Sequence, residues 1–137
     1  MYLVPEVYFH VMKLKRVALI AHDGKKDELV EFVKRHEAWF SQRELVGTGT
    51  TGGRIQALGL DVERLASGPL GGDAQIAARI TEGHLDAVMF FRDPMGKHPH
   101  EPDVNMLLRQ CDVHNVALAT NRATAELLVL AVNEGQA

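Results

Sequence analysis

Residues capable of acid–base and phosphate chemistry gather in a few short segments of this 137-residue chain, between runs of apolar residues. Carboxylates and imidazoles can transfer protons, and glycine-rich loops with hydroxyl groups can bind phosphate through backbone amides. The segments are His22-Asp23, Gly47–Gly53 (GTGTTGG), Ser67–Asp73 (SGPLGGD), Arg92-Asp93-Pro94 and His98–Asp103 (HPHEPD). Together they indicate proton transfer on a phosphorylated ligand.

The glycine-threonine segment suits a phosphate group. Its glycines allow close approach of the backbone, and Thr48, Thr50 and Thr51 can donate hydrogen bonds. Ser67 and Gly68 offer a similar pair in the next segment, and Lys26 could add a positive charge. The alternative is an ordinary helix N-cap, where threonine and glycine are both favoured. The spacing differs from that of a P-loop.

Asp73 is the first candidate for a general base, because the preceding Gly71-Gly72 pair leaves room for a substrate. A helix N-cap is the competing interpretation, since Ala74 opens a helical pattern. Asp23, Asp93 and Asp103 could converge on the same rim, where crowding and desolvation would raise carboxylate pKa values toward neutrality. Asp103 also suits the first turn of a helix.

The histidines allow a zinc site in principle. His98, His100 and His22 are the candidate ligands, but the chain lacks the closely spaced Cys or His pairs of typical zinc sites. We therefore expect no metal. His36, His84 and His114 are interpreted as surface or packing residues, and Cys111 as a core residue.

The elements that must position these residues alternate between strand and helix. Continuous apolar runs, as in Val17–Ala21 and Ala87–Phe91, predict strands buried on both faces. The complete set of predicted strands is 17–21, 44–46, 62–66, 87–91 and 116–119, and the predicted helices cover 25–38, 51–57, 74–82, about 102–111 and 123–130. This order predicts a single α/β domain in three layers, with a mainly parallel sheet. In such sheets ligands bind at the carboxyl ends of the strands, where the polar segments fall.

Composition narrows the class of protein. The net charge of -3 excludes a strong basic field for nucleic acid or an anionic membrane, and no run of about 20 apolar residues could span a bilayer. A single cysteine fits a reducing cytoplasm. We expect residues 1–15 to be an N-terminal extension with the start of the first strand, 16–132 the domain and 133–137 a tail. Residues 1–11 do not read as a signal peptide.

Six ordered blocks resemble the methylglyoxal synthase family over roughly residues 17–130. They are Ala21–Asp23, Thr48–Gly52, Ser67–Asp73, Phe90–Pro94, Pro99–Asp103 and Ala119–Asn121. The resemblance implies a carbon–oxygen lyase that converts dihydroxyacetone phosphate to methylglyoxal and inorganic phosphate without a cofactor. It also implies strand order 3-2-1-4-5, a homohexamer and inhibition by phosphate.

The same resemblance implies a role for each site residue. Asp73 would be the catalytic base, and His100 would polarise the substrate oxygens or carry protons. Asp23, Asp93, Asp103 and His22 would support them. The substrate would be held by His22, Lys26, Thr48, Thr50, Thr51, Ser67, Gly68 and His100.

The alternatives come from other functional classes. Related domains serve as allosteric ligand-binding modules, which need the phosphate loop but not Asp73, His100 and Asp103 together. A zinc hydrolase would lose activity with a chelator. Family members often carry a C-terminal arginine that reaches a neighbouring subunit; no arginine follows Arg122, so we do not expect that contact.

Overall fold

A five-stranded parallel sheet forms the centre of the molecule in the computed structural model, which describes residues 14–96 and 104–133. The strands are β1 (Arg16–Ala21), β2 (Glu44–Thr48), β3 (Val62–Leu65), β4 (Ala87–Phe91) and β5 (Ala117–Ala119). Their order is β3-β2-β1-β4-β5, and every pairing is parallel. The predicted strand order is therefore confirmed. The strand order reverses between β1 and β4, because β2 and β3 lie on one side of β1 and β4 and β5 lie on the other.

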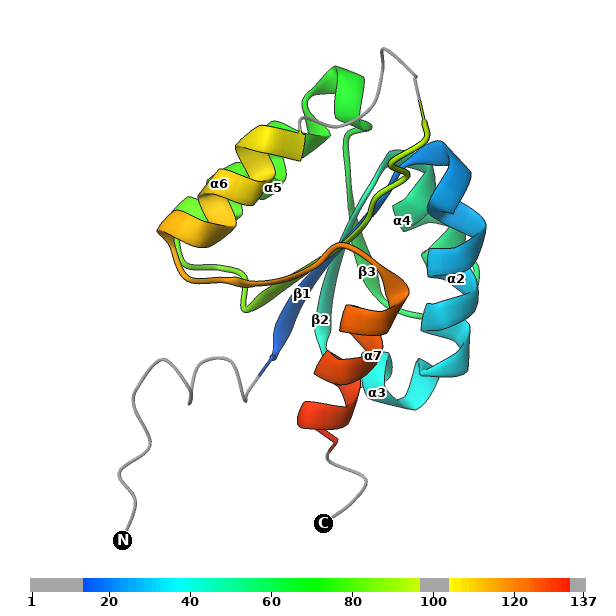
Figure 1. The fold of residues 1–137 in the computed structure, drawn as a ribbon. Helices are drawn as coiled ribbons and strands as arrows, with labels where there is room; N and C mark the ends of the chain where they lie inside the picture. The colour runs from blue at the N-terminus through cyan, green and yellow to red at the C-terminus, as the bar shows by residue number, and fades with distance from the viewer. Residues whose placement is uncertain (1–13, 97–103, 134–137) are drawn as a thin grey trace, which may run out of the picture.

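Helices cover both faces of this sheet (Figure 1). One face carries α2 (Lys26–Arg35), α3 (Glu37–Ser41), α4 (Gly49–Gln56) and α7 (Arg122–Ala131), and the other carries α5 (Gly72–Thr81) and α6 (Val104–Val113). Two short 3-10 turns, η1 (Asp23–Lys25) and η2 (Gly68–Leu70), follow β1 and β3. The three-layer α/β architecture predicted from the apolar runs is confirmed.

The central strands divide their side chains between two apolar clusters, because successive side chains of a strand point to opposite faces. In β1, Val17 and Leu19 pack with the α2, α3, α4 and α7 layer, whereas Ala18 and Ile20 pack with α5 and α6. Cys111 of α6 belongs to the second cluster and is buried, as expected. Burial raises the pKa of its thiol to about 11.

Several predicted boundaries were wrong. The predicted helix 25–38 is interrupted at His36, whose φ of -110° and ψ of 34° are not helical. After this break α3 buries Trp39 and Phe40. The helices α4 and α5 each begin two residues earlier than predicted, because glycines there adopt backbone conformations that propensity does not anticipate. The three histidines interpreted as surface or packing residues fit that interpretation: His84 and His114 are exposed, and His36 is half-buried, with its Nε2 atom 2.9 Å from the Glu126 carboxylate.

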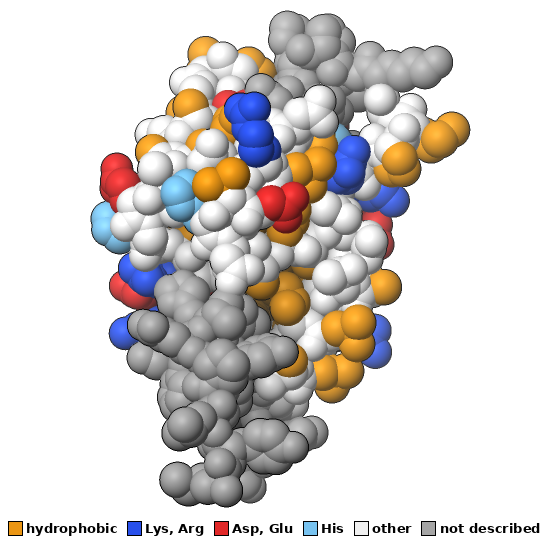
Figure 2. Space-filling view, turned by 60° about the vertical axis from the view of Figure 1, so that its left-hand side comes forward, with side chains coloured by type: hydrophobic (Ala, Val, Ile, Leu, Met, Phe, Trp, Pro, Cys, Tyr) orange, Lys and Arg blue, Asp and Glu red, His pale blue; other side chains and the backbone are white. Residues whose placement is uncertain are grey.

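Acidic, basic and apolar side chains are mixed on the surface over α5 and α6 (Figure 2). Within the described residues, no helix combines the length and apolar character required to cross a membrane.

Candidate active site

A cavity of about 190 Å³ opens at the carboxyl ends of β1, β2 and β3. It is smaller than the pockets that hold drug-sized ligands, so it suits a small metabolite. Its walls come from the loops after the three strands and comprise Ala21, Asp23, Lys26, Thr48, Gly49, Thr50, Thr51, Ser67, Gly68 and Pro69. The six residues predicted to hold the phosphate group therefore all line one cavity: they are Lys26, Thr48, Thr50, Thr51, Ser67 and Gly68.

The wall contributed by α4 has the geometry of an anion site. Thr48 occupies the N-cap position of α4 but makes no side-chain capping hydrogen bond, so the N-cap interpretation does not account for this threonine. The first-turn amides of a helix carry partial positive charge and attract anions. Thr48 and Thr51 are 8% and 1% exposed, and Thr50 is exposed beside them. The arrangement presents hydroxyl and amide donors together.

Two loops meet at Gly49. Its φ of +45° turns the chain from β2 into α4, and a Cβ atom there would lie 2.9 Å from the Cβ of Ser67. A side chain at position 49 would therefore be strained and would push the β3 loop away. This close approach brings Ser67 and Gly68 to the threonines.

Lys26 supplies the positive charge of the cavity. Its Nζ atom lies 2.8 Å from the carboxylate of Asp23, and its side chain is 22% exposed. Asp23 is itself 69% exposed and also lines the cavity. Asp23 thus holds the ammonium group at the cavity wall, where an anionic ligand would compete for it.

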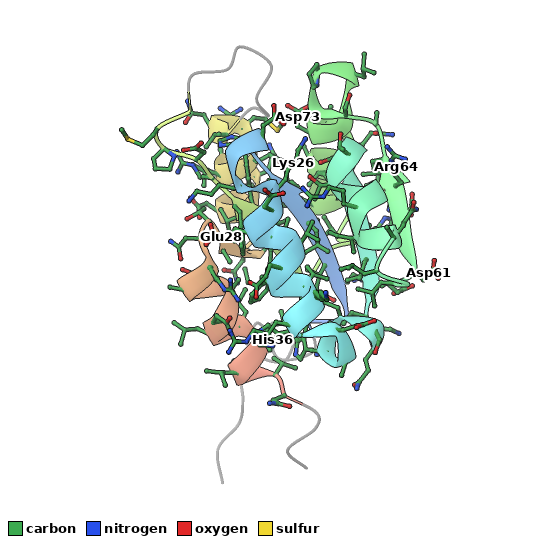
Figure 3. All side chains as sticks on the ribbon, turned by 90° about the vertical axis from the view of Figure 1, so that its right-hand side faces the viewer. Lys26, Glu28, His36, Asp61, Arg64 and Asp73 are labelled. Carbon is green, nitrogen blue, oxygen red and sulfur yellow. The ribbon has the colours of Figure 1, made fainter. Side chains whose placement is uncertain are left out.

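Asp73 lies in the first turn of α5, immediately beyond the loop that carries Ser67 and Gly68. The N-cap is Gly71, with a φ of +104°, so the interpretation of Asp73 as the N-cap was wrong. The Asp73 carboxylate accepts a hydrogen bond from the backbone N–H of Ala74 at 3.0 Å. It does not line the cavity wall, but it lies at the same end of the molecule as Lys26 (Figure 3).

The position of α5 depends on Gly72. A Cβ atom there would lie 1.9 Å from the carbonyl oxygen of Ala66, so α5 packs directly on the backbone that leaves β3. The N–H groups of Leu70 and Gly72 both donate to the carbonyl of Ser67, at 3.0 and 2.9 Å. This tight loop joins Asp73 to the cavity.

His22 and Asp93 form a second group of predicted site residues, which is not part of the cavity wall. The His22 ring is buried, packs edge-to-face on Phe90, and accepts a hydrogen bond at Nδ1 from the backbone N–H of Asp93 at 2.8 Å. A neutral His22 therefore carries its proton on Nε2. The Asp93 carboxylate accepts from the N–H of Met95 at 3.0 Å and lies against Gly24, where a Cβ would be 2.4 Å from Oδ2. Of the carboxylates expected to converge, Asp23 therefore lines the cavity, whereas Asp93 lies against Gly24 and is not part of the wall.

His98, His100 and Asp103 lie outside the described residues, and their predicted roles stay predictions. The zinc alternative depended on two of them. Among residues 14–96 and 104–133, no cluster of three or more His, Cys, Asp or Glu side chains could hold a metal ion.

A larger cavity, of about 450 Å³, lies at the opposite end of the sheet. Arg16 and Glu44 begin β1 and β2 at its edge, so it faces the amino ends of the strands, away from the usual ligand site of parallel sheets. Two of its charged side chains pair with each other, and the hydrogen bond from Arg79 lowers the pKa of the Glu63 carboxyl. We do not assign the active site to it.

Sequence reasoning missed Arg64 on β3. Its Nε atom donates to the carbonyl of Gly49 at 2.8 Å, so it contacts the turn that builds the phosphate loop. The only signal in the sequence was the Gly52-Gly53 pair inside a helix, an unfavourable choice that indicates close packing. The partner that packs there could not be read from the sequence.

Comparisons with known proteins agree with this geometry. Residues 28–120 match the family model of the MGS-like domain. The methylglyoxal synthase of Cupriavidus taiwanensis is 63% identical over 115 residues, which are 83% of this chain and 86% of that protein. The methylglyoxal synthase of Ralstonia nicotianae is 54% identical over 125 residues, or 90% of this chain and 93% of the relative.

A solved structure extends the comparison to the fold. The crystal structure of methylglyoxal synthase from Elizabethkingia anophelis superposes with a TM-score of 0.82 and 44% sequence identity, over 85% of this chain and 78% of that one. Both the sequence and the fold therefore place the chain in the methylglyoxal synthase family.

Proposed function

We propose that this protein is a lyase that converts dihydroxyacetone phosphate to methylglyoxal and inorganic phosphate. The observation that carries the proposal is the small cavity in which Lys26, three threonines and the start of α4 meet, next to the loop that leads into α5 and Asp73. A binding module would need only the phosphate-holding half of this arrangement. The relatives named methylglyoxal synthase, at 54% and 63% identity, favour the enzyme over the module.

The phosphate of the substrate would lie between α4 and Lys26. The hydroxyls of Thr48, Thr50 and Thr51, the amides of the first turn of α4 and the Ser67-Gly68 segment would donate hydrogen bonds to its oxygens. Lys26 would supply charge, and Asp23 would hold its ammonium group in place. His22 and His100 would bind at the carbonyl and hydroxyl oxygens of the triose.

Proton transfer would begin the reaction. Asp73 removes a proton from the hydroxymethyl carbon next to the ketone, and the electron pair moves onto the carbonyl oxygen to give an enediolate. His100, as a neutral imidazole, donates a hydrogen bond to that oxygen. Asp103, Asp23, Asp93 and His22 would support these groups; Nδ1 of His22 accepts from the Asp93 amide, which leaves an Nε2–H donor.

Elimination of phosphate would complete the reaction. The enediolate electrons expel phosphate as the carbon–oxygen bond breaks, and the resulting enol tautomerises to methylglyoxal. This bond must stand roughly perpendicular to the enediolate plane to overlap its π system. The phosphate loop would set that angle, which distinguishes elimination from simple isomerisation.

We also propose that the enzyme is a cytoplasmic homohexamer, inhibited by its product inorganic phosphate, with residues 16–132 forming one domain. The single cysteine, which is buried, supports a reducing compartment.

The test of the mechanism is the Asp73→Asn variant. We expect turnover to fall by several orders of magnitude while inorganic phosphate still binds, because only the proton acceptor is lost. Calorimetric titration with phosphate, beside steady-state turnover, separates the two effects. Near-normal turnover in this variant would remove Asp73 from the role of base.

A further inference from the structure

We infer that Arg64 is a positioning residue that holds and polarises the phosphate loop; this inference rests on the proposed function of that loop. Arg64 lies on β3, outside the cavity wall, and its side chain extends toward α4. Figure 3 shows Arg64 toward the same end of the molecule as Lys26 and Asp73. It therefore acts through the backbone of α4.

The contact with Gly49 is specific. The Nε atom of Arg64 donates to the Gly49 carbonyl oxygen at 2.8 Å, a charge-assisted hydrogen bond. Gly49 has the positive φ that turns β2 into α4, and it touches Ser67. Arg64 thus restrains the residue at which the two phosphate-binding loops meet.

The hydrogen bond between Arg64 and Gly49 also affects a backbone donor at the cavity. The Gly49 carbonyl and the Thr50 N–H belong to one peptide group, because a peptide unit spans consecutive residues. A cation bonded to the carbonyl oxygen withdraws electron density from the peptide and strengthens its N–H as a donor, as in hydrogen-bonded chains. Thr50 lines the cavity at the start of α4. Arg64 is therefore expected to strengthen the Thr50 amide toward phosphate.

The glycines of α4 make room for this arginine. A Cβ atom on Gly53 would lie 3.0 Å from Cζ of Arg64 and 3.1 Å from Nη1, and one on Gly52 would lie 3.2 Å from Cγ. The arginine side chain therefore lies directly against the helix backbone. Glycine disfavours a helix relative to alanine, and this packing gives Gly53 a physical reason to be present.

The experiment compares two arginines that make different contacts. Arg64→Met removes the bond to Gly49, whereas the control Arg54→Met removes a cation from α4 itself that pairs with Asp27 at 2.8 Å. Calorimetry with inorganic phosphate gives Kd, and turnover of dihydroxyacetone phosphate gives KM and kcat. We expect Arg64→Met to raise Kd and KM about three- to tenfold with kcat within about twofold, and Arg54→Met to change neither appreciably. Arg64→Lys, which retains the charge, should restore part of the affinity.

A second variant, Gly53→Ala, keeps the inference testable if Arg64→Met does not fold. Gly53→Ala favours the helix but forces the guanidinium away by a few tenths of an ångström. We expect an unchanged or higher Tm together with weaker phosphate binding, which a purely structural role would not produce. Unchanged phosphate affinity in both Arg64→Met and Gly53→Ala, while Thr50→Ala binds phosphate more weakly, would overturn the inference and leave the loop intact. If Thr50→Ala also binds phosphate normally, the proposed phosphate loop is misplaced and the role of Arg64 falls with it.

Discussion

Replacing Lys26 by methionine tests the phosphate end of the site most sharply, because the adjacent Lys25 provides a matched control. Both lysines lie at the start of α2. Lys26 lines the 190 Å³ cavity and pairs with Asp23 at 2.8 Å, whereas Lys25 lines a separate small cavity and lies 3.4 Å from Glu28. The two variants remove the same charge a single residue apart.

The size of the effect follows from the setting of the ammonium group. At an effective dielectric constant of about 20, two unit charges about 4 Å apart attract by about 4 kcal/mol. Phosphate carries between about one and a half and two charges at neutral pH, which increases this attraction. The release of Lys26 from Asp23 and the loss of hydration offset part of it. A net loss of about 2 kcal/mol corresponds to a Kd for phosphate about 30-fold higher.

The assay is calorimetric titration of each variant with inorganic phosphate at fixed ionic strength. We expect Lys26→Met to bind about 30-fold more weakly and Lys25→Met to remain within about threefold of the parent. Equal weakening in the two variants would show that only the general charge of this region matters. Normal binding by Lys26→Met would refute the assignment of the cavity to phosphate.

Two further predictions concern the structure that supports the site. Gly72→Ala would place a Cβ 1.9 Å from the Ala66 carbonyl oxygen, so we expect the free energy of unfolding, from chemical denaturation, to fall by about 3 kcal/mol; an unchanged value would show that α5 does not depend on this contact. The Cys111 pKa, raised by burial from 9.0 to about 11, implies a stability contribution that is complete below pH 9 and is lost as the pH rises through about 11. Chemical denaturation across this pH range should show a fall in the free energy of unfolding of the parent and a smaller fall in Cys111→Ala. An equal fall in both proteins would show that the Cys111 thiol is not its cause.

The sheet and its layers were predictable because they depend on patterns that are local in the sequence. The apolar runs of β1 and β4 and the polar segments that follow them located the strands, and the resemblance to a family supplied the strand order that the structure confirms. The threonines, Ser67 and Lys26 converge because the carboxyl ends of neighbouring parallel strands meet at one edge.

The details that were missed depend on contacts between distant segments. His36 interrupts a helix that propensity alone would continue, because Trp39 and Phe40 enter the core after the break. The early start of α5 and the displacement of Asp73 from the N-cap follow from the packing of Gly72 on Ala66. Where two backbone segments pack this closely, the only sign in the sequence is a glycine. The glycine does not show which distant segment packs against it.

The most direct test of the central claim is to incubate the purified protein with dihydroxyacetone phosphate and a metal chelator and to follow both products. Inorganic phosphate and methylglyoxal should appear in equal amounts and at the same rate, and the chelator should not slow them. Conversion of the substrate to an isomeric triose phosphate without release of phosphate, or no conversion at all, would contradict the proposed elimination.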